Sequence, residues 1–482
     1  MTSSAQSARP VKLSSLTEAA ALLAERARGG RVFIPAGPVE PLGLAEAFRA
    51  SPGLADDLSF CGLFVPGLNR FDWATLSPKA AAEVFLPSPD FAATIATGET
   101  RVIPCHYSAA WRYLRTAPFK AAVFHVAAPD AEGFCSLSLS ADASPAFLDR
   151  DVFKLGLINP SLPVVKGAPK LHVSALDAWV EADAPPAELS TPAPSGDVDA
   201  MVHHVTSLIE DGATLQAGIG KLPGAIMAGL TGRRGLSIHS GLIGDWILQL
   251  IEAEALSDRS DSLKAGIILG SHALQARMAQ ETRLKLIPIA ETHGEAHLGA
   301  IERFISLNAA LEVDLFGQIN CEFAGSRTLA GVGGAVDFLR GARLSPGGKP
   351  IVMVQSVGKN GEPRIVPRLT SPSVSIARSD APILVTEQGA IDLEPLDQDA
   401  RTQAIISLAA PQHRADLMSA WAQQRGARGR ARLTPFTVAW RTICAKPLRQ
   451  ANIQLAAFYP LNQTYAPPTR SRAIPPATGC AS

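Results

Sequence analysis

Apolar positions occur in short segments separated by glycine and proline. The first segment has the pattern of a helix and the second that of a strand. Residues 17–27 (TEAAALLAERA) predict an apolar helix, opened by a capping box in which Ser15 and Glu18 flank the first turn. Residues 31–35 (RVFIP) follow Gly30 and predict a short buried strand. Gly37 and a helix restarting at Pro41 come next, so the chain begins with helix, strand and helix.

The same order of elements returns in the second half. Residues 198–212 (VDAMVHHVTSLIEDG) predict a helix ending at glycine, and residues 213–217 (ATLQA) predict a strand followed by a glycine turn and Pro223. Gly30 and Gly212 are separated by 182 residues, and so are Pro41 and Pro223. Two tandem copies of one α/β unit are therefore expected, although any two α/β domains share strand–glycine–helix patterns.

Two more pairs of short motifs support the duplication, each in the same order in both halves. The pairs are LSF at 58–60 with LSI at 236–238, and Asp130-x-x-Gly133 with Asp314-x-x-Gly317. Strands alternating with helices predict open, mostly parallel sheets covered by helices. Ligands of such sheets bind beyond the carboxyl ends of the strands, so we expect a site in the cleft between the two domains.

Proline-rich stretches set the expected domain boundaries. The segment APPAELSTPAPSG contains four prolines and has the composition of a semi-rigid linker. The expected organisation is listed from the N-terminus: a flexible start at 1–14, a first α/β domain at 15–183, the linker at 184–197, a second α/β domain at 198–455 and an irregular tail at 456–482.

Composition narrows the class of protein. The chain is 482 residues long, 47% hydrophobic and 18% charged, which is enough apolar material for a large core. Its 44 basic and 44 acidic side chains give no net charge, which argues against nucleic-acid binding. The six cysteines form no CxxC pair, so we expect neither a disulfide framework nor a zinc site. Without an N-terminal signal sequence or an apolar stretch long enough to span a bilayer, the sequence predicts a cytoplasmic protein with no membrane partner.

Two glycine-rich segments are candidates for chemistry. The first, residues 216–224 (QAGIGKLPG), reads as strand, turn and helix start, where free N–H groups favour an anion such as a phosphate. Its spacing is neither the dinucleotide fingerprint nor a Walker motif, and tight packing of the turn explains it equally well. The second, residues 330–338 (AGVGGAVDF), exposes successive N–H groups that can stabilise an oxyanion, or forms a plain hairpin.

Other candidates are weaker. His293-Gly294-Glu295-Ala296-His297 resembles a metal motif but lacks the HExxH spacing, so we expect a solvated loop and no metal site. Glu387 follows an apolar strand and is either catalytic or an acid at a helix N-terminus, the second being favoured. No GxSxG motif is present to anchor a serine-hydrolase triad.

The motifs taken together resemble a known family. AGIGKLPGAI, LSIHSGLIGD, LNAALEVDLFGQINCE, GVGGAVDFLRGA, RIVPRL and LVTEQGAIDL follow one another as in the acetyl-CoA hydrolase/transferase family, which includes acetate, succinate and 4-hydroxybutyrate CoA-transferases. HVAAPDAEGFCSLSLSAD and INPSLPVVKG in the first half add to the resemblance, which spans roughly residues 15–425. It implies a tandem pair of open α/β domains, with a homodimer as the expected assembly.

The resemblance also implies a site. In the family a glutamate attacks the acyl-CoA thioester, and CoA then passes to a carboxylate acceptor through a glutamyl-CoA intermediate. By resemblance, coenzyme A is a substrate and not a bound cofactor, and the oxyanion donors are Gly331, Gly333 and Gly334. The residues that would line the CoA site are Gln216, Ala217, Gly218, Ile219 and Gly220, with Lys359 as a further contact.

One position departs from the family pattern. Relatives carry I-H-[ST]-E-x-x-x-D, whereas this chain has Gly241 at the position of the nucleophilic glutamate. The usual covalent intermediate cannot form on a glycine. His239 and Ser240 beside it are candidates to replace the lost group, or to activate a water, and Asp245 is expected to be structural. The family's GGQ is GGA here, with Ala335.

Three functions remain open at this stage. The first is an acyl-CoA enzyme that moves CoA between small carboxylates or hydrolyses a short acyl-CoA. The second is a binder that retains acyl-CoA without catalysis. The third is a nucleotide-dependent oxidoreductase, which the absence of GxGxxG makes remote.

Overall fold

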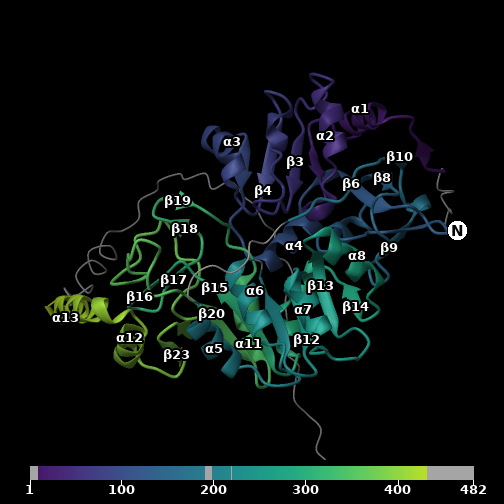
Figure 1. Ribbon diagram of the computed structural model, residues 1–482. Coiled ribbons are helices and arrows are strands. Elements are labelled where there is room, and N and C mark those ends of the chain that lie inside the picture. The colour runs from purple at the N-terminus through teal and green to yellow at the C-terminus, as the bar shows by residue number, and fades with distance from the viewer. Residues whose placement is uncertain (1–8, 190–197, 219, 431–482) are drawn as a thin grey trace, which may run out of the picture. The chain divides into compact units, whose positions relative to one another are not determined.

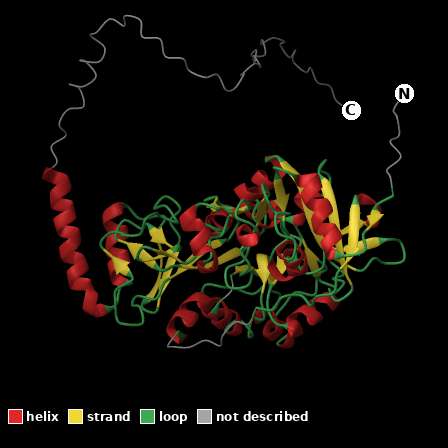
Figure 2. Cartoon of the chain, turned by 90° about the horizontal axis from the view of Figure 1, so that it is seen from above, coloured by secondary structure: helices red, strands yellow, loops and turns green. Residues whose placement is uncertain are grey.

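The computed structural model describes residues 9–189, 198–218 and 220–430. These residues form two eight-stranded sheets whose strands are connected largely by helices, and smaller two- and three-stranded sheets accompany them. Every pairing in the first sheet is parallel, and the second sheet is parallel apart from one edge pair. The expected fold, two tandem and similar open α/β domains with mostly parallel sheets, is confirmed. Figure 1 and Figure 2 show the helices interleaved with the strands.

The first sheet is built from residues of the first half of the chain. In order across it, the strands are β1 (Val11–Lys12), β10 (Ala178–Glu181), β8 (Phe153–Asn159), β6 (Phe119–Ala127), β2 (Arg31–Phe33), β3 (Ser59–Gly62), β4 (Ala81–Val84) and β5 (Thr100–Val102). The second sheet reads β14 (Leu284–Leu286), β13 (Leu263–Ile268), β12 (Ser237–Ile243), β11 (Thr214–Ala217), β15 (Phe304–Ala309), β20 (Lys349–Met353), β22 (Ile383–Thr386) and β23 (Gly389–Asp392).

The two sheets share one topology. In each, the strand predicted from the sequence repeat, β2 or β11, lies in the middle. The next three strands of the chain extend from it to one edge. Later strands extend to the other side, where β1 adds a further edge strand to the first sheet. Strand order therefore reverses beside β2 and beside β11, and such reversal points are where open α/β sheets bind ligands.

The repeated motifs occupy equivalent places. Ser59 pairs with Arg31 on β2, as Ser237 pairs with Thr214 on β11. Each Asp-x-x-Gly motif forms the same turn: the glycine has φ of +87° or +84°, and its N–H donates to the carbonyl of the aspartate three residues earlier. The aspartate side chains also accept from the backbone N–H four residues later, at 2.8 and 2.9 Å. A left-handed glycine is what this turn requires.

Helices alternate with the strands along much of the chain. Those of the first half are α1 (Leu16–Ala27), α2 (Leu42–Arg49), α3 (Ala92–Thr97) and α4 (Tyr107–Thr116). Those of the second half are α5 (Asp199–Ser207), α6 (Lys221–Ala228), α7 (Trp246–Glu252), α8 (His272–Gln280), α9 (Ile289–Thr292), α10 (Glu295–Gly299), α11 (Ala335–Leu344), α12 (Gln398–Ser407) and α13 (Arg414–Arg430). Half of the predicted capping box is present: the Ser15 hydroxyl accepts from the N–H of Glu18, whereas the Glu18 carboxylate accepts from the N–H of Ser14 and not from that of Ser15.

Smaller strands complete the fold. β7 (Phe134–Ser136) pairs with β9 (Lys170–His172), and β16 (Glu312–Asp314) lies between β17 (Ile319–Asn320) and β21 (Ile365–Val366). The hairpin of β18 (Phe323–Ala324) and β19 (Arg327–Thr328) stands over the cavity described below. No helix among the residues that the structure describes is long and apolar enough to cross a bilayer.

The two halves pack tightly against each other. The Leu139 carbonyl accepts from Ile268, the N–H of Ala141 donates to Gly266, and the Gly167 carbonyl accepts from Leu286, at 2.8–2.9 Å. One apolar cluster contains buried side chains of both sheets. Three parts of the predicted organisation lie outside the described residues: 1–8 at the start, 190–197 of the linker, and 431–482, which comprises the end of the second domain and the whole tail. The boundaries at 15–183 and 198–455 remain proposals.

Candidate functional site

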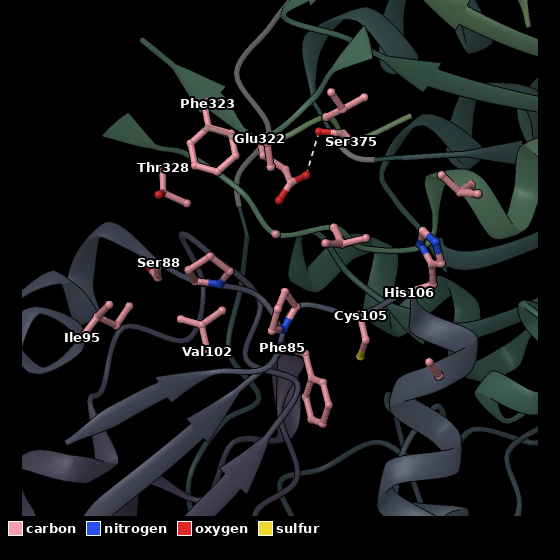
Figure 3. Close-up of a pocket in the computed structure, with 18 of the residues that line it drawn as sticks. Phe85, Ser88, Ile95, Val102, Cys105, His106, Glu322, Phe323, Thr328 and Ser375 are labelled. Carbon is pink, nitrogen blue, oxygen red and sulfur yellow. Dashed lines mark hydrogen bonds between the residues drawn. The ribbon is translucent and has the colours of Figure 1, made fainter. Parts of the chain in front are cut away.

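A cavity of about 1090 Å³ separates a segment of the first half from a segment of the second. Residues 85–109 form one wall, which includes Ile95 and Val102 (Figure 3). Phe85 borders this wall, but its ring is buried and packs edge-on against Tyr113. Residues 322–380 form the other, where Phe323 and Thr328 come from the β18–β19 hairpin. The lining is mostly apolar, and the volume matches that of a pocket for a drug-sized ligand.

Few charged groups line this cavity. Arg340 and Asp380 form a bidentate pair at 2.8 and 3.2 Å. Glu322 is buried, and its Oε1 accepts from Ser375 Oγ at 2.7 Å (Figure 3). Arg327 is exposed on β19, where solvent screens its charge. The Nδ1 atom of His106 is buried without a hydrogen-bond partner among the described residues.

The glycine loop at residues 331–334 borders the cavity, because Gly331 and Val332 belong to its lining. Among the described residues, no backbone N–H of this loop donates a hydrogen bond. The Gly333 carbonyl, in contrast, accepts from the N–H of Tyr107 at 3.1 Å, which fixes the loop against the first half. A β-carbon on Gly331 would lie 2.7 Å from the Phe85 carbonyl oxygen, so only glycine fits. These free N–H groups suit an oxyanion, as the sequence predicts.

Gly241 lies on β12 and has an extended backbone, not a left-handed one. A β-carbon added there would lie 3.0 Å from Cε1 of His293 and 3.8 Å from Phe338. The same imidazole approaches the loop, since a β-carbon on Gly334 would lie 2.4 Å from its Nε2. The space that a longer side chain at 241 would need is therefore filled by His293.

His293 corrects the expectation of a solvated loop. It is 4% exposed, its ring packs on Phe338 and Tyr107 with centroids 4.4 and 4.8 Å apart, and its Nδ1 bonds to Thr292 Oγ1 at 2.8 Å. Burial lowers the pKa of His293 to about 3, so the ring is neutral at neutral pH. Its neighbours come from α4 and α11, and no local sequence signal could have indicated them. No cluster of three metal-binding side chains occurs in the described part of the chain.

The residues beside Gly241 point in different directions. His239 is buried on the face of β12 to which residue 241 also belongs. It bonds through Nε2 to the Glu291 carbonyl at 3.1 Å, and burial lowers its pKa to about 4. Ser240 points to the opposite face, because side chains alternate along a strand, and donates to the Ala217 carbonyl at 3.0 Å. The structure thus places His239 near His293 and Ser240 away from it.

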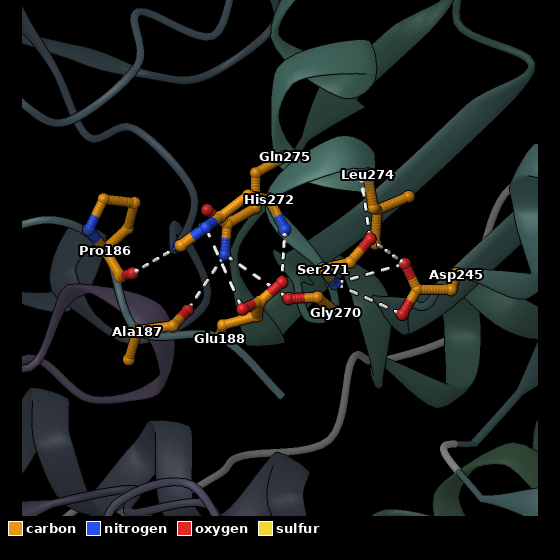
Figure 4. Close-up of polar contacts among 9 residues, drawn as sticks. All are labelled: Pro186, Ala187, Glu188, Asp245, Gly270, Ser271, His272, Leu274 and Gln275. Atoms are coloured by element: carbon orange, nitrogen blue, oxygen red, sulfur yellow. Dashed lines mark hydrogen bonds and ion pairs between the residues drawn. The ribbon is translucent and has the colours of Figure 1, made fainter. Parts of the chain in front are cut away.

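Asp245 holds the start of α8. Its carboxylate accepts from the N–H of Ser271 at 3.1 and 3.2 Å and from the Ser271 hydroxyl, while Ser271 caps α8 (Figure 4). Glu188 and Ala187, at the start of the proline-rich segment, accept from His272 and Gln275 of the same helix. This network is structural, as the sequence suggests for Asp245.

The proposed CoA residues lie apart from the cavity. Gln216 is buried, and its Oε1 accepts from the Leu307 N–H at 3.2 Å, bridging β11 to β15 where strand order reverses. Gly218 faces open space, and Gly220, at φ +114°, caps α6; Ile219 lies outside the described residues. The buried Ala217 and the exposed Lys359, in the turn at 358–362, also lie outside the cavity lining. The glycine loop at 331–334 is thus the only predicted site segment that lines it.

Glu387 is not at a helix N-terminus. It lies in the turn between β22 and β23, where its carboxylate accepts from the N–H of Ser356 at 3.0 Å and from the Ser356 hydroxyl. An apolar strand followed by an acid predicted a helix start, but the antiparallel return of β23 replaces it.

The sequence is similar to those of known proteins. Residues 270–421 match the acetyl-CoA hydrolase/transferase C-terminal domain. The chain is 34% identical over 311 residues to a 4-hydroxybutyrate coenzyme A transferase of Clostridium kluyveri, covering 63% of this chain and 72% of that one. It is 31% identical over 328 residues to a succinyl-CoA:cyclohexane-1-carboxylate CoA transferase of Geobacter metallireducens, covering 66% of this chain and 75% of that one.

Solved structures show the same fold. RipA from Yersinia pestis is 25% identical, with a TM-score of 0.79 over 86% of this chain and 98% of that one. A 4-hydroxybutyrate CoA-transferase from Porphyromonas gingivalis is 25% identical, with a TM-score of 0.69 over 85% and 97% of the two chains. From these matches together, the chain belongs to the acetyl-CoA hydrolase/transferase family.

Proposed function

We propose that this chain is an acyl-CoA-handling enzyme, which moves CoA between small carboxylates or hydrolyses an acyl-CoA. The observation that carries the proposal is the large apolar cavity bordered by residues 331–334, whose backbone N–H groups have no acceptor among the described residues. A thioester carbonyl placed against this loop would be polarised, and the negative charge that develops on its oxygen would be stabilised.

The carboxylate nucleophile of the family has no counterpart at residue 241. Glycine supplies no attacking atom, and the adjacent His293 is held neutral with Nδ1 engaged by Thr292. Cleavage then requires another nucleophile. For hydrolysis, a water oxygen attacks the carbonyl carbon, the C–S bond breaks, and CoA leaves as the thiol while the acyl group leaves as the carboxylic acid.

The phosphates of CoA are assigned to the N-terminus of α6. Gly218 and Gly220 leave the turn open, and the positive end of the helix dipole favours an anion there. Gln216 and Ala217, at the end of β11, precede this turn, and by family resemblance Ile219 and Lys359 are further candidate contacts. Family resemblance further supports a cytoplasmic homodimer that binds neither nucleic acid nor membrane, and light scattering of the purified chain would test the assembly.

The test is incubation with an acyl-CoA, with and without acetate, followed by measurement of free CoA, of new acetyl-CoA and of the intact protein mass. Gly331→Ala, which would press on Phe85, should lower the rate about tenfold or more if the loop holds the carbonyl. Gly232→Ala is the matched control, because a β-carbon there meets nothing within 4 Å. Binding of acyl-CoA with no CoA release, transfer or adduct would contradict the enzyme proposal.

A second function is favoured by one observation. His293 fills the space beside Gly241, as expected if the chain binds acyl-CoA without catalysis. The same incubation separates the two functions, because a binder would retain acyl-CoA intact.

A further inference from the structure

We infer that the cavity between residues 85–109 and 322–380 takes the acyl group of the substrate, and that this group is uncharged, apolar and larger than acetyl. The inference rests on the proposed function, because it assumes an acyl-CoA ligand, and it names the class of acyl group. Three features of the cavity support the inference: apolar walls on both sides, contact with the glycine loop, and the buried charge of Glu322 in the lining.

The walls offer apolar surface from both halves of the chain. Ile95 and Val102 of the first half and Phe323, Val332 and Val374 of the second contribute apolar side chains to the lining. Val374 is 43% exposed and Ile95 is partly exposed, so both have apolar surface left for a ligand to bury. Each buried methylene group raises affinity by about fourfold. An acetyl group, with one methyl, would leave most of a cavity of about 1090 Å³ without contacts.

Contact with residues 331–334 orients the ligand. If the thioester carbonyl lies against the free N–H groups of this loop, the chain beyond the carbonyl carbon continues along Gly331 and Val332, which line the cavity. The polar adenine, ribose and phosphate groups of CoA find few hydrogen-bonding partners on these apolar walls. The acyl end of the substrate is therefore the part that fits the cavity.

The charged residues of the cavity lining disfavour an acyl group that carries a carboxylate of its own. Arg340 and Asp380 neutralise each other, so the charges left are the buried Glu322 and the exposed Arg327. Glu322 is 7% exposed, and water screens it poorly compared with Arg327. A dicarboxylic acyl group such as succinyl would bring its free carboxylate close to Glu322, and like charges brought together in a poorly solvated site oppose binding.

The exposed alanines of α3 provide a matched pair of variants. Ala96 lines the cavity, and Ala93 on the same helix does not. Both are exposed, so a large side chain at either position is compatible with folding. Ala96→Trp should fill part of the cavity, and Ala93→Trp should not.

The experiment is calorimetric titration of the full-length chain with free CoA and with acetyl-, butyryl-, hexanoyl-, cyclohexanecarbonyl- and succinyl-CoA. We expect hexanoyl- or cyclohexanecarbonyl-CoA to bind about tenfold or more tightly than acetyl-CoA, and succinyl-CoA to bind no better than acetyl-CoA. Ala96→Trp should remove most of the gain from the larger groups and leave the affinity for free CoA unchanged, whereas Ala93→Trp should change neither. Glu322→Gln should improve succinyl-CoA relative to hexanoyl-CoA.

The titrations distinguish failure of the inference from failure of the proposed function. If acetyl-CoA binds as tightly as the larger esters, or if Ala96→Trp has no more effect than Ala93→Trp, the inference is wrong while the proposed function stands. If neither CoA nor any of its esters binds, the proposed function itself is wrong, and the inference falls with it.

Discussion

Cε1 of His293 lies 3.0 Å from the place that a β-carbon on Gly241 would occupy. The two residues are far apart in sequence, yet the imidazole, held between Tyr107 and Phe338, closes the position where the family pattern has a glutamate. A single substitution at 241 cannot restore the family arrangement unless His293 moves.

Gly241→Glu is expected to destabilise the fold by about 1–3 kcal/mol, because the new side chain overpacks the imidazole. Adding His293→Ala should recover part of this loss, which makes the two substitutions non-additive. Urea unfolding of the two single variants and the double variant measures the coupling. Equal stability of Gly241→Glu and the wild type would show that His293 does not fill the site.

The double variant is also the one expected to gain CoA transfer between an acyl-CoA and acetate, since it alone offers a carboxylate with room to react. A steady-state transfer assay, with mass detection of a glutamyl-CoA thioester at residue 241, measures the gain. A folded double variant with neither transfer nor adduct would favour the non-catalytic binder.

His293 illustrates what sequence could not indicate. The strand–glycine–helix order, the repeat and the Asp-x-x-Gly turns depend on local backbone preferences, and the structure confirms them. Burial of His293 depends on rings from α4 and α11, contributed by distant parts of the chain. Gly294 and its polar neighbours predicted a solvated loop; Glu295, Ala296 and His297 are indeed exposed, and packing against the rings of Tyr107 and Phe338 buries His293 alone. The cavity was likewise unpredictable in detail, because its two walls come from different halves.

The neutral state of His293 predicts a dependence of stability on pH. The imidazole protonates near pH 6.5 in the unfolded chain and only near pH 3 in the folded one, so between these values the unfolded state binds more protons. Its contribution, on the order of 5 kcal/mol, is present above pH 6.5 and is lost as pH falls towards 3. His293→Phe should therefore flatten the acid side of the stability profile.

Other buried groups also make stability depend on pH, so the effect of His293 has to be measured as the difference between His293→Phe and the wild type. Burial lowers the pKa of His239 and of His125 to about 4, and these histidines act in the same direction. Burial raises the pKa of Asp142 to about 6, which instead removes stability as pH rises from about 4 to 6. Urea unfolding from pH 4 to 8 should separate His293→Phe from the wild type, with the exposed His297→Asn as control. Parallel profiles of His293→Phe and the wild type would contradict a buried neutral ring.

Close backbone contact between the halves predicts a large effect at Gly167. A β-carbon there would lie 1.8 Å from the Leu284 carbonyl oxygen, and Gly167 itself accepts from the Leu286 N–H at 2.8 Å. Gly167→Ala should cost about 3 kcal/mol or more, since the backbone of β14 must shift. Thermal unfolding beside Gly232→Ala, which meets no neighbour, measures it. Equal melting temperatures would mean that the halves do not pack as described.

Two substitutions in the turn before α6 should have different effects, one on CoA binding and the other on stability. Gly218 has open space around its added β-carbon, so Gly218→Val should fold normally and lower the affinity for free CoA about tenfold by obstructing the phosphates. Gly220→Ala should cost about 1–3 kcal/mol of stability, because φ of +114° strains any residue with a side chain. Calorimetry and thermal unfolding of both variants check this. Unchanged CoA affinity in both variants would show that the phosphates of CoA do not bind at this turn.

Occupancy of the cavity beside the glycine loop by acyl-CoA can be tested at Cys105. This thiol lines the cavity and is half-buried, and burial raises its pKa, so alkylation should be slow but measurable at mildly alkaline pH. The fully buried Cys61 and Cys135 provide internal references in the same peptide map. The measurement is the rate of Cys105 alkylation with and without saturating hexanoyl-CoA. We predict that the ligand slows it about tenfold or more by covering the thiol; an unchanged rate while hexanoyl-CoA is bound would contradict the claim.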